Sequence, residues 1–268
     1  MVPRTAGVRE GVPMCGHEYH LSTAFPAGGP PLTPVLRDVG QINMFFRVEP
    51  GPPTPGWVPV TGDGLTRERV AEEVELVRAR LGALSGGPED VEWRVGASLF
   101  HQGLASRLLS PVLAAALCYG VRLRAGRFLL EPERAGTLVL RTAQTRAEPV
   151  SDRPGEVVEW LDQDVVGGVL AGTEAALAGV GRISPGLLRG NTASALAGAA
   201  RALGGARPHH RSGAEEVVRL MLERPALKGA GAYTGVDRSG LAVFRRTTCC
   251  LYYRLPEGGL CGDCALRS

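Results

Sequence analysis

Four of the six cysteines in this 268-residue chain lie within its last twenty residues. Cys249 and Cys250 are adjacent, and Cys261 and Cys264 form a C-x-x-C pair. Thiols gathered this densely are open to unwanted oxidation unless a disulfide or a metal uses them. The rest of the chain is therefore interpreted as a scaffold for this segment.

The spacing between the two cysteine pairs constrains the backbone. In an extended strand the side chains of Cys249 and Cys250 would point to opposite faces, so the backbone must bend for both to reach one centre. A straight strand over residues 251–255 would travel roughly 16 Å, and the turn at 256–259 leaves too little chain for the return. The segment must therefore curl or take a helical turn. Gly262 permits unusual backbone angles in the C-x-x-C turn.

Four thiolates satisfy either a tetrahedral zinc ion or a [2Fe–2S] cluster, and spacing alone does not separate the two. Zinc ribbons typically have two C-x-x-C pairs and this chain has one, which favours an iron–sulfur site and leaves a disulfide pair as a third alternative. Arg245, Arg246 and Arg254 lie close in sequence to the cysteines. Positive charge there would raise the potential of a cluster, unless these arginines are simply solvated.

Composition and charge argue against nucleic-acid binding and membrane spanning. The net charge of +3 comes from interspersed acidic and basic residues and forms no basic stripe. The most apolar window, residues 104–123, contains Arg107, Pro111 and Arg122, which is too polar for a membrane span. The N-terminus shows no apolar secretory signal. We therefore expect a cytoplasmic, reducing location, where clustered cysteines are metal ligands or redox groups rather than disulfides.

Residues 1–60 are rich in proline and glycine, which excludes regular helix over most of this span. The exception is residues 41–48, which predict one apolar strand. Cys15, His17 and His20 have the composition of a metal site, but three such residues in a loose arm are better interpreted as surface residues. We interpret residues 1–60 as a Pro/Gly-rich N-terminal arm.

Helical spacing dominates residues 61–240. Residues 66–84 predict an amphipathic helix, and residues 91–109 a second helix that Ser110 and Pro111 break or kink before a further helix over 112–119. Later helices are predicted over 157–180, from a Ser184 cap to Gly204, and from a Ser212–Glu215 capping box to Pro225.

Short alternating runs between residues 121 and 141 predict a small antiparallel sheet, and residues 241–244 predict a strand leading to the cysteines. The sequence therefore predicts an α+β fold, a mostly helical single domain with a small antiparallel sheet and a C-terminal four-cysteine iron–sulfur segment. We divide it into the N-terminal arm (1–60), a helical α+β domain (61–240) and a C-terminal cluster-binding segment (241–268).

Residues 245–264 read RRTTCCLYYRLPEGGLCGDC. This run resembles the C-terminal signature of the FhuF-like ferric-siderophore reductases, whose C-C-x10-C-x2-C spacing it matches without a gap. The resemblance extends more weakly to residues 98–106 and 190–196. It implies a [2Fe–2S] cluster with Cys249, Cys250, Cys261 and Cys264 as ligands.

The resemblance also implies reduction of Fe(III) held in a siderophore, often of hydroxamate type. Hard oxygen chelators bind Fe(III) far more tightly than Fe(II), so one electron loosens the iron without breaking the chelator. The glycines at 179–181 and 229–231 do not complete a dinucleotide-binding G-x-G-x-x-G motif. We therefore expect an external electron donor, such as a ferredoxin or flavin reductase, and at most peripheral membrane contact.

Two other functions stay open on the residues alone. One is a zinc-stapled binding or regulatory domain, and the other is an iron–sulfur electron carrier or iron sensor without a substrate pocket. Only a reductase requires a cleft beside the cluster with room for a chelate of, on the order of, several hundred cubic ångströms.

Other polar residues receive no catalytic assignment. His101, His209 and His210 are better interpreted as structural or exposed residues. Asn191 is expected to tie two helices together or to touch substrate. Cys118 is expected to be a core thiol and Cys15 a surface thiol.

Overall fold

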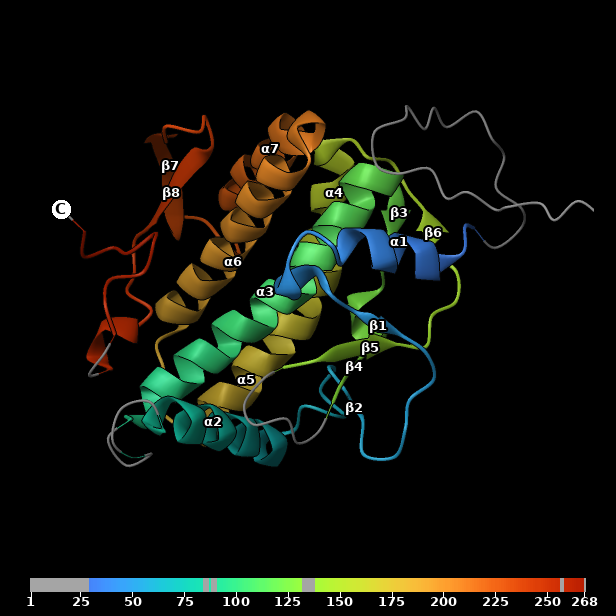
Figure 1. Cartoon of the computed structure of the whole chain (residues 1–268). Helices are drawn as coiled ribbons and strands as arrows, with labels where there is room; N and C mark the ends of the chain where they lie inside the picture. The colour runs from blue at the N-terminus through green and yellow to red at the C-terminus, as the bar shows by residue number, and fades with distance from the viewer. Residues whose placement is uncertain (1–28, 84–86, 88–90, 132–137, 256–257, 268) are drawn as a thin grey trace, which may run out of the picture.

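Two long helices, α3 (Trp93–Tyr119) and α6 (Pro185–Ala206), pack side by side through the centre of the molecule (Figure 1). Both are apolar on nearly all sides, which is typical of helices buried within a bundle. Residues 107–117 of α3 are all buried, and small side chains at Ala193, Ala197 and Ala200 let α6 approach closely. This pair forms the platform on which the other elements lie.

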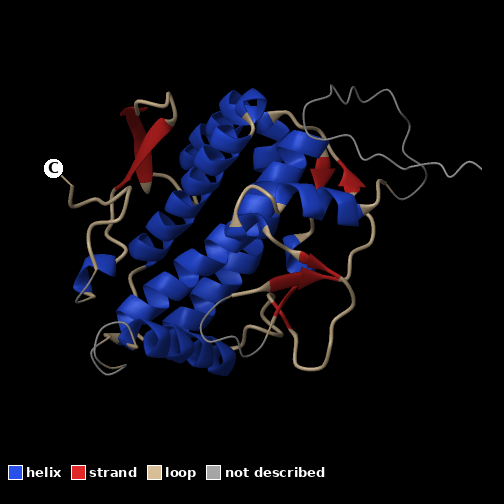
Figure 2. Ribbon diagram, viewed as in Figure 1, coloured by secondary structure: helices blue, strands red, loops and turns tan. Residues whose placement is uncertain are grey.

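The computed structural model describes residues 29–83, 87, 91–131, 138–255 and 258–267. Five shorter helices surround the central pair (Figure 2). They are α1 (Leu32–Val39), α2 (Arg67–Gly82), α4 (Pro154–Leu161), α5 (Ala171–Val180) and α7 (Arg211–Glu223), and a π-helical segment, η4 (Asp162–Leu170), joins α4 to α5.

The strands are short and form three separate sheets. The largest has the order β1-β5-β4-β2, with β1 and β5 parallel and the other neighbours antiparallel. The remaining pairs, β3–β6 and β7–β8, are antiparallel. The strands are β1 (Glu49–Pro50), β2 (Val58–Pro59), β3 (Val121–Arg122), β4 (Phe128–Leu130), β5 (Leu140–Thr142), β6 (Glu148–Pro149), β7 (Gly231–Val236) and β8 (Ala242–Arg246).

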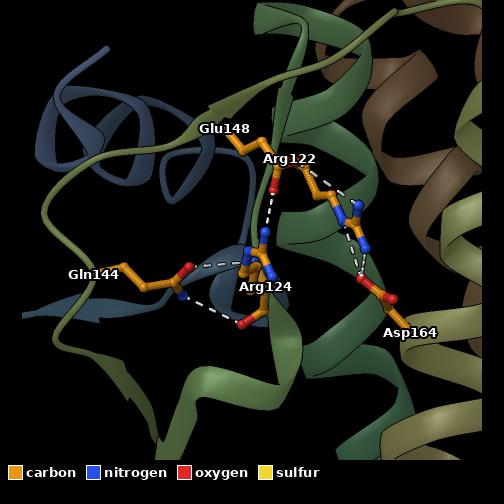
Figure 3. A network of polar contacts seen from close by, with 5 residues as sticks. All are labelled: Arg122, Arg124, Gln144, Glu148 and Asp164. Carbon is orange, nitrogen blue, oxygen red and sulfur yellow. Dashed lines mark hydrogen bonds and ion pairs between the residues drawn. The ribbon is translucent and has the colours of Figure 1, made fainter. Parts of the chain in front are cut away.

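Polar contacts join β3 and β6 to the π-helical segment (Figure 3). Arg122 forms an ion pair with Asp164, and Arg124 donates to Glu148 at 2.8 Å. The Gln144 amide donates to the Arg124 carbonyl at 3.2 Å and accepts from its backbone N–H at 3.3 Å. Exposed pairs of this kind contribute up to about 1 kcal/mol each. Their main effect is to fix the position of the small sheet against η4.

The predicted α+β, mostly helical fold is confirmed, as are the helix over 66–84, the helical stretch over 157–180 and the strand before the cysteines. The helix after Ser184 is also confirmed, although the Ser184 side chain makes no capping hydrogen bond. Residues 29–60 contribute Leu32, Leu36 and Phe46 to the main core. The division at residues 60 and 240 stays a prediction.

Several local predictions are wrong. Pro111 does not break the chain into two helices, because α3 continues through it and buried contacts on all sides outweigh one lost hydrogen bond. Residues 32–39 form α1 with Pro34 in its first turn, where proline is tolerated.

Three further predictions fail for local reasons. Residues 44–46 form a 3-10 turn, η1, rather than a strand, because Asn43 accepts a hydrogen bond from the Phe45 N–H. Ser212 is the second residue of α7 and not its N-cap, which is His210. Residues 121–122 pair with β6 and not with the larger sheet, which is mixed rather than purely antiparallel.

None of the described helices is long and apolar enough to cross a lipid bilayer.

Gly190 provides a test of the packing between α6 and the C-terminal segment. A Cβ atom there would lie 2.1 Å from Thr248 Oγ1 and 3.0 Å from Arg246 Nη2. We expect Gly190→Ala to lower the free energy of unfolding by about 1–3 kcal/mol, measured by urea denaturation. Gly198→Ala on the same helix is the matched control, because a Cβ atom there meets nothing within 4 Å. Gly198→Ala should raise the free energy of unfolding by about 0.5–1 kcal/mol. Equal changes in the two variants would contradict close packing at Gly190.

Candidate iron–sulfur site

The chain bends sharply where the cysteine segment begins. After β8 ends at Arg246, the backbone reaches Cys249 and Cys250 and then turns at Leu251, which has a left-handed φ of 69°. A 3-10 turn, η6 (Tyr252–Arg254), follows directly. The predicted bend and helical turn are therefore confirmed, and among the described residues Leu251 rather than Gly262 takes the unusual angle.

The four sulfurs lie in one neighbourhood. Cys250 and Cys264 are buried, whereas Cys249 and Cys261 are partly exposed. The Sγ atoms of Cys250 and Cys261 are 3.6 Å apart. Backbone N–H groups of Leu251 and Leu266 donate to the sulfurs of Cys249 and Cys264, each at 3.3 Å. None of the five described cysteines forms a disulfide.

The sulfurs influence one another electrostatically. Hydrogen bonding from Cys261 lowers the pKa of Cys250 to about 6, while the pKa of Cys261 itself is raised, first by this contact and then by burial. Burial raises the pKa of Cys249, and the nearby thiols of Cys250 and Cys264 raise it further. The contact between the two sulfurs therefore favours the thiolate of Cys250 over that of Cys261.

A chain of buried hydrogen bonds fixes the bend to both central helices. On α3, Ser98 Oγ donates to the Cys250 carbonyl at 2.8 Å. On α6, Asn191 Nδ2 donates to the Ser98 carbonyl at 2.9 Å and to its Oγ at 3.1 Å. Arg246 Nη2 donates to Asn191 Oδ1 at 2.6 Å. We call this set of four residues the polar tether.

Further contacts hold the rest of the loop. Arg246 N–H donates to the Asp263 carbonyl at 3.1 Å, and Arg245 Nη1 to the Cys264 carbonyl at 2.9 Å. Midway between the two cysteine pairs, Leu255 packs in a small apolar cluster with Val91 and Val95 at the start of α3. The cysteine segment is therefore held both at the C-x-x-C turn and in the middle of the intervening loop.

A cleft of about 590 Å³ opens beside the cysteine loop. Its polar lining on the central helices includes Gln102, Ser106 and Ser110 from α3 and Ser194 from α6. Gly262 and Asp263, which lie between Cys261 and Cys264, form part of the same wall. The remaining lining includes Asn43, Phe45, Phe46, Gly198, Arg201, Asp237 and residues 242–244.

Residues 246–266 match the family described as the FhuF 2Fe-2S C-terminal domain. This segment is similar to the FhuF 2Fe-2S C-terminal domain and is called the FhuF-type domain below. The resemblance noted in the sequence is confirmed there, and its cofactor is a [2Fe–2S] cluster. No curated protein matches the chain significantly.

The residues of the FhuF-type domain fit such a cluster. Two thiolates on one tetrahedral metal, with metal–sulfur bonds near 2.3 Å, lie about 3.8 Å apart, close to the separation of Cys250 and Cys261. Amide donors to the other two sulfurs are the contacts that stabilise cluster thiolates. Within the described ranges, no three His, Cys, Asp or Glu side chains surround one point as a single metal ion requires.

The other candidate ligands include three residues of the N-terminal arm and one cysteine of α3. Cys15, His17 and His20 lie outside the described residues. Cys118 is partly buried in α3 rather than fully in the core.

The histidines outside the arm have structural positions. His101 is fully buried, with Nε2 3.2 Å from Glu174 Oε1. His209 and His210 lie in a 3-10 turn before α7. The structural interpretation of Asn191 is confirmed, because it links α6 to α3.

Four residues of the site were not predicted from the sequence: Ser98, Gln102, Ser106 and Ser110. They recur every four residues along an otherwise apolar helix, so they share one face of α3. That periodicity was the available signal, since a polar stripe on a buried helix requires partners.

We expect Cys261→Ser or Cys264→Ser to remove the visible absorption of the cluster, because each would lose one of the sulfurs that the domain offers to iron. The measurement is the anaerobic absorption spectrum with iron and sulfide analysis. Cys118→Ser is the control and should keep the spectrum. A cluster spectrum of full intensity in both variants would remove these cysteines from the ligand set.

We expect Ser98→Ala to destabilise the folded protein by about 1–3 kcal/mol. It leaves the buried Cys250 carbonyl without its Ser98 donor. Urea denaturation measures the effect, and Ser106→Ala is the control on the same helix, because Ser106 Oγ donates only within α3, to the Gln102 carbonyl at 2.9 Å. A loss of unfolding free energy smaller in Ser98→Ala than in Ser106→Ala would show that the polar tether contributes little to stability.

Proposed function

We propose that the chain is a cytoplasmic ferric-siderophore reductase, which converts siderophore-bound Fe(III) to Fe(II) by one-electron reduction. The observation that carries the proposal is that residues of the cysteine segment form part of the cleft lining. A ligand in the cleft contacts Gly262 and Asp263, the two residues between Cys261 and Cys264. In this proposal Cys249, Cys250, Cys261 and Cys264 hold the cluster, which supplies single electrons when bound.

The cleft has suitable dimensions and chemistry for a chelate. Its volume of about 590 Å³ lies within the range of small-molecule sites, roughly 300–1,000 Å³. Hydroxyl and amide groups on α3 and α6 provide hydrogen-bond donors for an oxygen-rich ligand, and Phe45 and Phe244 provide apolar surface. A hydroxamate chelate combines both kinds of surface.

The charges near the cleft favour a ligand without large negative charge. Arg201 forms an ion pair with Asp237, so its charge is largely compensated, and Asp263 adds a carboxylate on the loop side. A neutral ferric hydroxamate meets no repulsion there, whereas a strongly anionic chelate would. Asp237 and Asp263 are therefore proposed to contribute to substrate choice.

Each Fe(III) consumes one electron, which the protein must regain. We propose an external donor protein, such as a ferredoxin or flavin reductase, and at most peripheral contact with a membrane. A zinc-stapled domain is not retained, because the FhuF-type domain has a [2Fe–2S] cofactor. An electron carrier or sensor does not require a cleft beside its cluster, and this separates it from the reductase.

The proposal is tested by anaerobic reduction with dithionite, removal of excess reductant and mixing with a ferric hydroxamate. The expected result is return of the oxidised cluster spectrum together with one trapped Fe(II) per electron released. Reoxidation without Fe(II), or a cluster that stays reduced, would contradict siderophore reduction.

Gly198→Leu tests the cleft. Gly198 lines it, is exposed on α6 and has no atom within 4 Å of an added Cβ, so the leucine side chain should occupy the cleft without disturbing the core. We expect the KM for ferric hydroxamate to rise about tenfold or more, a loss of about 1.4 kcal/mol of binding, with an unchanged cluster spectrum.

Gly172→Leu is the matched control, because Gly172 is also an exposed helical glycine with nothing within 4 Å but lies on α5, outside the cleft lining. Equal KM values in the two variants would place substrate elsewhere on the molecule.

A further inference from the structure

Arg246 is a buried cation whose charge is not neutralised by a neighbouring carboxylate in the described part of the chain. Its side chain is about 1% exposed. Nη2 donates to Asn191 Oδ1 and lies 3.5 Å from the Leu187 carbonyl, and both partners are uncharged. Nε and Nη1 are buried and have no hydrogen-bond partner among the described residues.

A guanidinium in this position requires compensation. Burying an unpaired charge is strongly destabilising unless a group of opposite charge lies close to it. The guanidinium group of arginine stays positively charged in folded proteins. A negative group must therefore lie close to Arg246 in the working protein.

The cysteine segment adjoins Arg246 and can supply negative charge. Arg246 is the last residue of β8, three positions before Cys249 and directly before the bend. Its backbone N–H also donates to the Asp263 carbonyl within the C-x-x-C turn. Four thiolates give a [2Fe–2S] cluster a net negative charge, which increases on reduction.

We propose that Arg246 is the buried counter-ion of the cluster and a positioning residue that raises its reduction potential. A fixed positive charge in a poorly polarisable interior stabilises the reduced, more negative form more than the oxidised form. The tether holds the guanidinium in place through Asn191, which also contacts Ser98 and, through it, the Cys250 backbone.

The other arginines near the cluster differ in their surroundings. Arg254 is exposed and pairs with Glu92 at 2.5 Å, so solvent and the carboxylate both screen its charge. Arg245 is partly exposed and donates to the Cys264 carbonyl. Asp263 acts in the opposite sense, because its carboxylate disfavours negative charge on Cys250 and Cys261. Arg246 is thus expected to have the largest effect of the three arginines.

The test is a redox titration of the cluster-loaded, full-length protein, followed by visible absorption and electron paramagnetic resonance. In Arg246→Gln the ratio of reduced to oxidised cluster at a fixed ambient potential should fall at least tenfold, equivalent to a fall of about 59 mV for a one-electron couple. Arg246→Lys keeps the positive charge and should recover most of the wild-type ratio. Arg254→Gln is the control and should change it less than threefold.

Three results would overturn the proposal: a ratio within threefold of wild type in Arg246→Gln, equal ratios in Arg246→Gln and Arg246→Lys, or an equal fall in Arg254→Gln. If Arg246→Gln does not retain the cluster, the comparison moves to Asn191→Asp, which places a carboxylate against the same guanidinium. A lowered ratio there supports the counter-ion role, and an unchanged ratio refutes it.

The inference rests on ligation by the cysteines and not on the identity of the substrate. The titration contains no siderophore, so failure of siderophore reduction leaves the potential difference between the variants intact. Conversely, a reduction potential that does not depend on Arg246 would refute the counter-ion role and leave the proposed reductase function unaffected.

Discussion

The hydrogen bond from Ser98 to the Cys250 carbonyl is the contact on which the site depends. The left-handed backbone at Leu251 is unfavourable for a branched residue and persists only if neighbouring contacts fix it. Ser98 and Asn191 provide those contacts from two helices whose own packing is extensive and apolar. The rigidity of the α3–α6 pair is thereby transmitted to a loop that has little hydrophobic core of its own.

The same helix face serves the cleft. Ser98 holds the loop, and the next polar residues along that face, Gln102, Ser106 and Ser110, line the cavity. Gln102 also donates a hydrogen bond to Ser194 on α6 at 3.2 Å. This row of polar residues therefore finds a hydrogen-bond partner on the neighbouring helix as well as facing the cleft. One row of residues thus determines both where the cofactor lies and which surface a ligand meets.

Local sequence patterns predicted the local parts of this protein. The bend and the 3-10 turn after Cys250 followed from the reach of a short segment, and most helices followed from apolar periodicity. Contacts between distant segments were not predictable, because nothing in the sequence around Arg246 indicates that Asn191 lies against it. The expectation that the helix would be interrupted at Pro111 was wrong for a related reason. Burial on every side of α3, and not the low helix propensity of proline, determines that the helix continues there. The location of the cleft depended on the same long-range packing.

The tether also implies an order of events in folding. Ser98 and Cys250 are separated by 152 positions in the chain, so their hydrogen bond closes a very long loop and contributes nothing until that loop has formed. The helices α3 and α6 can pack before the cysteine segment is in place, and they then present Ser98 and Asn191 as a preformed surface. We therefore expect an interval in which the platform exists and the thiols are still accessible, and this is when iron and sulfide can enter.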